Sequence, residues 1–216
     1  MTASTTTGLA RAIAGLYEEF GDGPLARPLH GCEDCADTET LKRWAQTPLR
    51  QLPAKELDTY LYSALATIGD EEDFKHFFPR LFELTAGDDD LLDITFELVG
   101  SHLSRARWQQ WPDRQRTPVR IALEELWKTL GVKEYAASAI DSIVCGVALA
   151  RMDMLTLLTA WQKASAPISR ANLERFMEHN RDSLKRKRRL ANAFWDDSPA
   201  QEVIVADWLR SAMSVY

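Results

Sequence analysis

Apolar residues along this chain recur with the period of an α-helix, and this pattern restricts the fold more than any other feature. Between Leu57 and Ile68 apolar residues stand at positions i, i+3, i+4, i+7, i+8 and i+11, which places them on one face of an amphipathic helix. Similar segments recur from Leu9 to Met213, and no segment alternates apolar and polar residues over the length of a strand. The pattern therefore predicts an all-α fold of about ten helices.

Glycine, proline and capping residues mark the expected helix boundaries. Gly69 is expected to adopt the left-handed conformation that ends a helix over residues 57–68, and Asp70 to cap the next helix. In RTPV, residues 116–119, we expect the threonine to cap a helix and the proline to occupy its first position. A long helix is expected from about residue 170 to residue 195, with Trp195 on its apolar side.

The segment YAASAIDSIVCGVALA, residues 135–150, is apolar on nearly every side. A helix of this kind belongs at the centre of a fold, and Cys145 within it is expected to be a small core residue. Short connections and the proline-interrupted helix around Pro79 suggest an irregular, HEAT-like α–α array. No period of roughly 35–45 residues repeats, so a single helical domain over residues 1–216 is the competing arrangement, and we predict one domain.

Length and composition indicate the class of protein. With 216 residues, 45% of them hydrophobic, the chain is long enough to bury a sizeable core. No apolar run approaches the roughly 18 residues of a transmembrane helix, and the N-terminus lacks the basic start and apolar core of a signal peptide. Three cysteines do not form a disulfide framework. We therefore expect a cytoplasmic protein with reduced thiols and no membrane contact.

The segment RPLHGCEDCADTET, residues 27–40, holds Cys32 and Cys35, preceded by His30. Two thiolates at this spacing suit zinc, with His30 as a third ligand, but a structural site needs a fourth ligand and no second Cys/His pair is visible. A redox pair normally belongs to a β/α pattern, which is absent. The preferred interpretation is that both thiols pack beneath a helix capped by Asp37. No metal and no cofactor are expected.

Charge is unevenly distributed around a net of −6. Residues 54–99 contain 12 acidic and 3 basic side chains, whereas residues 170–189 contain 8 basic and 3 acidic ones. Acids at helix starts interact favourably with the helix dipole, and the alternative is a face that binds another protein, possibly a basic one. The candidate partner-binding residues are Asp70, Glu71, Asp73, Asp88, Asp89, Asp90 and Asp93.

The five consecutive basic residues Lys185 to Arg189 raise the question of nucleic-acid binding. On a helix, five consecutive residues spread around more than one turn, and the chain matches no nucleic-acid-binding motif. Nucleic acid is therefore not expected as a partner. Instead, some of these side chains are expected to pair with the acidic segment and others to lie along apolar surface.

Enzyme signatures are missing from the sequence. It contains no glycine-rich phosphate loop, no Gly-x-Ser-x-Gly and no His-Glu-x-x-His, the motifs that would indicate nucleotide, hydrolase or zinc-protease chemistry. Asp73 and His76 share a helix face, but a di-iron centre needs more such units, so a solvated surface pair is expected. An enzyme is less expected than a binding protein.

Residues 48–84, PLRQLPAKELDTYLYSALATIGDEEDFKHFFPRLFEL, resemble a group of uncharacterised bacterial proteins. In that group a Cys-x-x-Cys segment precedes three sequence patterns: L-R-x-L, Y-x-x-x-A-L-x-T-x-G-D and D-F-K-x-F-x-P-R. Here these are Cys32–Cys35, Leu49–Leu52, Tyr60–Asp70 and Asp73–Arg80. The resemblance implies a bacterial cytosolic helical protein. No activity is assigned to the group, so no catalytic residue is carried over.

These features favour a protein that binds another macromolecule. The sharper hypothesis is an inhibitor or immunity-type protein that masks a basic surface with its acidic helices. The alternative is a metal-dependent or enzymatic module built around His30, Cys32 and Cys35.

Overall fold

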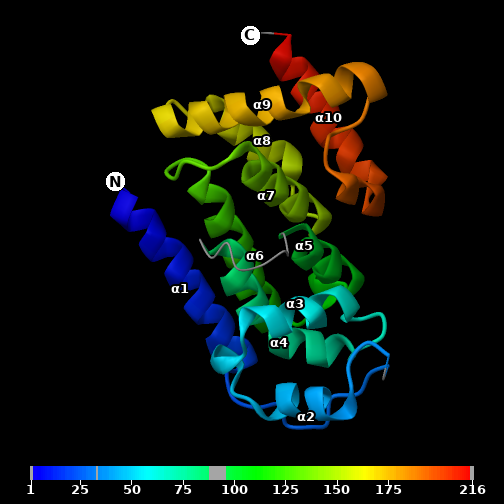
Figure 1. Cartoon of the computed structure of the whole chain (residues 1–216). Helices are drawn as coiled ribbons and strands as arrows, with labels where there is room; N and C mark the ends of the chain where they lie inside the picture. Colours follow the sequence, from blue (N-terminus) through cyan, green and yellow to red (C-terminus); the bar gives the residue numbers. More distant parts are fainter. Residues whose placement is uncertain (1, 33, 88–95, 215–216) are drawn as a thin grey trace. The chain divides into compact units, whose positions relative to one another are not determined.

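The structure is a computed structural model that describes residues 2–32, 34–87 and 96–214 (Figure 1). It is 73% helical with 10 helices and no strand in the described part, which confirms the all-α prediction. No helix within the described ranges is both long enough and apolar enough to span a membrane. The helices are α1 (Thr2–Phe20), α2 (Thr38–Gln46), α3 (Ala54–Ser63), α4 (Glu71–Ala86), α5 (Phe96–Arg105), α6 (Asp113–Thr129), α7 (Ala137–Leu149), α8 (Met154–Lys163), α9 (Pro167–Lys187) and α10 (Pro199–Met213).

The chain forms two compact units. The N-terminal unit comprises residues 10–122, and the C-terminal unit comprises residues 1–9 and 123–216. In the described part of the chain, three short 3₁₀ turns join some of the helices, namely η1 (Leu49–Gln51), η2 (Trp108–Gln110) and η3 (Ala193–Asp197). A single domain over the whole chain stays a prediction.

Aromatic side chains from α3, α4 and α5 build the core of the N-terminal unit. The rings of Tyr60 and Phe77 lie 4.3 Å apart between centroids, and Phe82 meets Phe96 edge-on at 5.5 Å. Such pairs add to the stabilisation that burial of the rings provides. Pro79 is also buried inside α4, where its missing N–H removes one helical hydrogen bond.

The connection between α3 and α4 differs from the prediction. The apolar pattern predicted a helix through Ile68, but α3 ends at Ser63 and Leu65 adopts a φ of 61°. Ile68 is still fully buried, although it reaches the core from a turn. The apolar spacing was therefore correct for the burial of Ile68, but Leu65 is only half-buried and the helix end was wrong.

The start of α4 is as expected. Gly69 has a φ of 70°, and the Asp70 carboxylate accepts hydrogen bonds from the N–H groups of Glu72 and Asp73. In return, the Asp73 carboxylate accepts the Asp70 N–H at 3.0 Å. This capping box confirms Asp70 as the N-cap and satisfies backbone donors that a helix start leaves unpaired.

In the C-terminal unit α7 packs against α9, and α8 packs against α10 (Figure 1). The side chain of Cys145 has no exposed surface, which confirms its prediction as a core residue. The one acid in this helix, Asp141, accepts a hydrogen bond from the Asn180 amide at 2.9 Å, and Asn180 accepts the Ala191 N–H at 2.8 Å. The buried carboxylate is thus bonded, as burial of a polar group requires.

Two further helix boundaries correct the sequence interpretation. α6 begins at Asp113, not at Pro118 after a Thr117 cap, because the Pro112 carbonyl already accepts the Arg116 N–H at 3.0 Å. Pro118 therefore lies inside the helix. α9 ends at Lys187, where Arg188 turns to a φ of 57°, and the buried Trp195 lies in η3, not at the end of a long helix.

Candidate functional site

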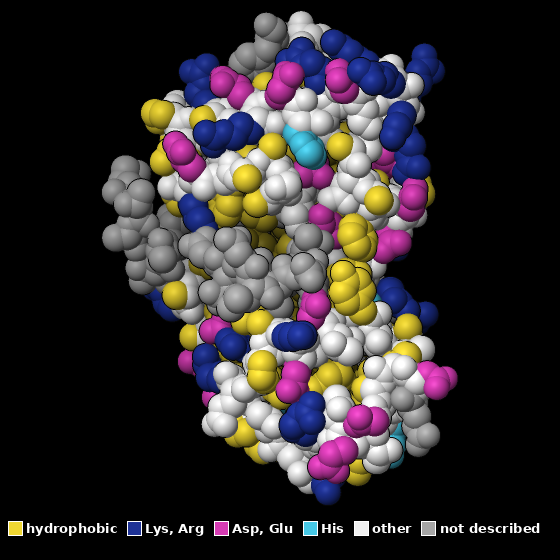
Figure 2. Space-filling view, in the orientation of Figure 1, with side chains coloured by type: hydrophobic (Ala, Val, Ile, Leu, Met, Phe, Trp, Pro, Cys, Tyr) yellow, Lys and Arg dark blue, Asp and Glu magenta, His cyan; other side chains and the backbone are white. Residues whose placement is uncertain are grey.

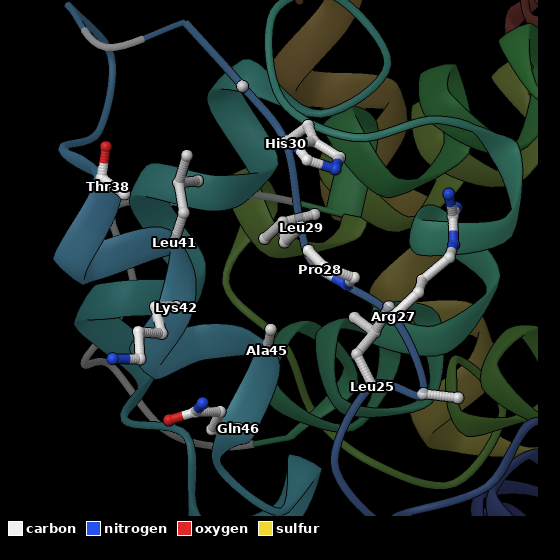
Figure 3. Close-up of a pocket in the computed structure, with 12 residues that line it drawn as sticks. Leu25, Arg27, Pro28, Leu29, His30, Thr38, Leu41, Lys42, Ala45 and Gln46 are labelled. Carbon is white, nitrogen blue, oxygen red and sulfur yellow. The ribbon is translucent and has the colours of Figure 1, made fainter.

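A segment of the N-terminal unit, residues 25–31, bends at Ala26 and Arg27, then runs in extended form beside α2 and encloses with it a groove of about 620 Å³ (Figure 3). At one end the Leu25 N–H donates to the Ala45 carbonyl at 2.8 Å. At the other end the chain turns back into α2, whose first turn is capped by the Asp37 carboxylate accepting the Thr40 N–H at 2.7 Å. This confirms Asp37 as the predicted N-cap. A groove of this volume is within the range of binding sites for small ligands or peptide segments.

The floor of the groove is apolar. Leu29 extends from the segment toward α2 (Figure 3), and Leu41 and Ala45 rise from the helix; all three are buried. Pro28 adds a further apolar group to the segment wall. The apolar surface that is still open to water lies on the segment wall, at Pro28 and partly at Leu25, and an occupant of the groove would remove that surface from water.

One backbone edge of the extended segment is paired and the other is free. The Cys32 N–H donates to the Thr67 carbonyl, and the Gly69 N–H donates to the His30 carbonyl, both at 2.8 Å. Backbone groups alternate in direction along an extended chain, so those of Leu29 and Gly31 point away from residues 67–69. They have no hydrogen-bond partner in the described part of the chain.

Gly31 allows the segment to approach its paired neighbour closely. It forms an isolated antiparallel bridge with Ile68, and a Cβ atom at this position would lie 2.9 Å from Cγ1 of Ile68. Glycine is therefore required by the close contact. The paired side is tightly fitted, whereas the groove side remains open.

Three basic residues, Arg27, His30 and Lys42, belong to the groove lining, but the side chains of Arg27 and His30 point away from α2 (Figure 3). No Asp or Glu is among the described lining residues of the groove. The position of the Arg27 side chain is fixed by two carboxylates at the start of α4, because its guanidinium pairs with Asp70 and lies 2.8 Å from the Asp73 carboxylate. The hydrogen bond from Arg27 lowers the pKa of Asp70, and burial raises the pKa of Asp73.

The described residues of the predicted acidic face already have cationic partners. Asp70 and Asp73 bind Arg27, and Glu71 lies 2.9 Å from the Lys75 ammonium. Asp73 is only 2% exposed, so it is not at the surface. The remaining candidates Asp88, Asp89, Asp90 and Asp93 lie outside the described residues. A partner-binding role for this set stays a prediction.

The expected solvated pair of Asp73 and His76 is not observed. Asp73 is buried, and His76 is half-buried with its Nε2 atom enclosed and unpaired. Burial lowers the pKa of His76, because the charged imidazolium loses its hydration. The helical spacing placed both residues on α4 correctly but did not reveal how deeply that helix is buried.

The two cysteines near the N-terminus occupy different environments. Cys32 is exposed, whereas Cys35 is half-buried with its Sγ atom 3.2 Å from Oγ1 of Thr67. The expectation that both thiols pack beneath the helix start is therefore wrong for Cys32. No group of three or more His, Cys, Asp or Glu side chains that could hold a metal ion is found among the described residues.

The basic residues Lys185 to Arg189 are exposed at the end of α9, where Lys and Arg side chains gather (Figure 2). Arg189 pairs with Glu202 at 2.9 Å and with Asp196 at 2.6 Å, and Arg186 lies 3.4 Å from Asp182. These partners are local, so the predicted pairing with the acidic segment is not observed in the described part.

Sequence reasoning did not identify the groove. The sequence pattern indicated His30 and the two cysteines as candidate metal ligands. It did not indicate that Leu29, Leu41 and Lys42 line the same groove. The available signal was weak: prolines 24 and 28 favour extended backbone before them, and a helix cap follows. Neither feature shows that the segment and α2 leave a space between them.

No protein-family model, curated protein or solved structure matches this chain.

Proposed function

We propose that this protein is a macromolecular interaction protein that binds an extended, acidic segment of another protein in the groove between residues 25–31 and α2. The observation that carries the proposal is that the backbone groups of Leu29 and Gly31 are unpaired within the described part of the chain, and that both residues line a groove with an apolar floor. An extended peptide can add to such an edge through main-chain hydrogen bonds, and pockets for its alternate side chains supply specificity.

An added peptide strand would contact the unpaired backbone edge and the apolar floor of the groove at the same time. Alternate side chains of an added strand point to the same face, so one set would meet Leu29, Leu41 and Ala45 on the floor. The other set would point outward. An edge of two residues supplies few hydrogen bonds, and affinity must therefore also come from apolar anchors on the floor.

The charge of the groove favours an acidic occupant. Lys42 lines the groove, is exposed on α2 and has no ion-pair partner in the described part of the chain, whereas the charge of Arg27 is already compensated by Asp70 and Asp73. Complementary charge mainly increases the rate of association and excludes like-charged partners. This preference is opposite to the basic partner expected from the acidic helices.

The acidic segment, residues 54–99, is the second candidate surface. Its described candidates Asp70, Glu71 and Asp73 are already paired with Arg27 and Lys75, so they offer little uncompensated charge to a basic protein. The groove is therefore the better-supported surface. An inhibitor or immunity-type role would follow if the acidic segment that enters the groove belongs to a functional site of its partner.

The proposal can be tested with a random peptide library displayed on phage. We expect selected peptides to contain an acidic residue near apolar residues that alternate in spacing. N-methylation at every second residue should abolish binding in one register and spare it in the other, because only alternate N–H groups of an added strand face the edge. Equal effects in both registers would contradict strand addition.

A charge reversal on the groove wall tests the location. Lys42→Glu should weaken binding of the selected acidic peptides, mainly through slower association that depends on salt. Lys55→Glu is the matched control, since Lys55 is also exposed but lies on α3 and does not line the groove. Equal losses in both variants would show that the peptides do not bind in this groove.

A further inference from the structure

Cys32 and Cys35 lie on one hydrogen-bonded turn. The Cys35 N–H donates to the Cys32 carbonyl at 3.0 Å, and the Ala36 N–H approaches the same carbonyl at 3.2 Å. A turn of this type brings its first and fourth Cα atoms to within about 7 Å. A disulfide requires a Cα separation of about 4.4–6.8 Å, so the backbone already holds the two residues near the spacing of a bridge.

Both ends of this turn are anchored to the same residue. The Cys32 N–H donates to the Thr67 carbonyl at 2.8 Å, and the Cys35 Sγ lies 3.2 Å from the Thr67 hydroxyl. Cys32 is exposed, so a reagent in solution can reach its sulfur, whereas Cys35 is half-buried. An accessible thiol and a more protected one at this spacing match the two roles in thiol–disulfide exchange, attack and resolution.

Apolar packing and zinc binding both agree less well with this geometry than a disulfide between the two cysteines does. Apolar packing does not explain why Cys32 is exposed. A structural zinc site needs four ligands, and among the described residues no His, Cys, Asp or Glu joins the two thiols in a group that could hold a metal ion. The backbone spacing of the two residues and the unequal exposure of their thiols favour a bridge between them instead.

We propose that Cys32 and Cys35 form a reversible disulfide by exchange with low-molecular-weight disulfides of the glutathione type. The Cys32 thiolate attacks one sulfur of the small disulfide, forms a mixed disulfide and releases one small thiolate. The Cys35 thiolate then attacks the Cys32 sulfur, forms the Cys32–Cys35 bond and releases the second small thiolate. Two protein thiols are oxidised, the small disulfide is reduced to two thiols, and the protons pass to solvent.

The test is equilibration of the full-length protein in buffers with a series of ratios of oxidised to reduced glutathione. Acid quenching, alkylation and mass spectrometry then report the state of each cysteine. We expect the loss of two hydrogen masses, located by peptide mapping to Cys32 and Cys35 and reversed by excess reduced glutathione. Cys145 is the internal control, because its buried thiol should stay unmodified in the native protein.

Single substitutions separate the two roles. The Cys35→Ser protein should accumulate a mixed disulfide between Cys32 and glutathione, since the resolving thiol is missing. The Cys32→Ser protein should keep Cys35 as a free thiol under the same conditions, and circular dichroism should show both variants folded. Free thiols at both positions in the most oxidising buffer, or disulfides only between chains, would overturn the proposal. Peptide binding in the groove is not needed for any of these measurements.

Discussion

The imidazole Nε2 atom of His102, in α5, lies 2.6 Å from the backbone carbonyl oxygen of Leu61, in α3. A carbonyl only accepts hydrogen bonds, so Nε2 carries the proton and donates. In a longer helix the Leu65 N–H would bond this carbonyl, but it donates to the Ile68 carbonyl instead, at 3.3 Å. His102 therefore satisfies one of the carbonyl groups that the end of α3 leaves unpaired.

Removal of this donor should destabilise the N-terminal unit. His102 is 2% exposed, so His102→Leu leaves the Leu61 carbonyl buried without a partner, which costs about 1–3 kcal/mol. Urea denaturation measures the change in the free energy of unfolding. His179→Leu is the control, because His179 is exposed on α9, and it should change stability little. Equal stability of the His102→Leu protein and the parent would show that this bond contributes nothing.

His76 should make stability depend on pH. Burial lowers its pKa from the ordinary value of 6.5, so between the folded pKa and 6.5 the unfolded chain binds more protons than the folded one. Stability therefore rises with pH across this window and falls as the pH drops below 6.5. Urea denaturation at several pH values measures the slope. His76→Gln should reduce this slope, and an unchanged slope would assign the dependence to other groups.

Gly69 should resist substitution. Its φ is 70°, which disfavours residues with a Cβ atom, and a Cβ there would lie 2.9 Å from Cβ of Asp73. Gly69→Ala should therefore disturb the capping box and destabilise the protein by about 1–3 kcal/mol. Gly23→Ala is the control, since a Cβ at Gly23 meets no atom within 4 Å. Thermal unfolding should show a lower melting temperature than the parent for the Gly69→Ala protein and an unchanged one for the Gly23→Ala protein.

Helix identity could be predicted from the sequence because burial follows the helical period. Leu57, Tyr60 and Leu61 are buried as their spacing indicates, and Asp37 and Asp70 cap the helices that follow them. Helix ends were harder to predict. Leu65 and Arg188 turn the chain with φ values of 61° and 57°, although neither is glycine, the residue by which a left-handed turn is normally recognised.

The candidate site was harder to predict than the helix ends, because it depends on the space between a helix and a segment that pack together only in the folded chain. The Cys-x-x-Cys spacing identified a pair of thiols but not that one is exposed and the other half-buried. Acidic residues indicated charge at the start of α4, but their partner Arg27 is far away in the sequence and comes from the groove wall. Contacts of this kind follow from tertiary packing and have no local sequence signal.

The turn after α9 supplies a prediction for the C-terminal unit. The buried Glu202 carboxylate accepts the Leu190 N–H at 2.9 Å and also binds the Arg189 guanidinium, with Nη2 at 2.9 Å. Glu202→Ala should destabilise the protein by about 1–3 kcal/mol, because it leaves the Leu190 N–H without its partner. Glu202→Gln should cost less, since the amide oxygen can still accept that hydrogen bond.

Arg189→Ala separates the backbone bond from the ion pair. The Arg189 side chain is 48% exposed, and exposed ion pairs contribute little in water, so this variant should lose less stability than Glu202→Ala. Urea denaturation of the three variants at low and high salt makes the comparison. If Arg189→Ala and Glu202→Ala lose equal stability, and salt removes both effects, the ion pair and not the Leu190 hydrogen bond holds the end of α9.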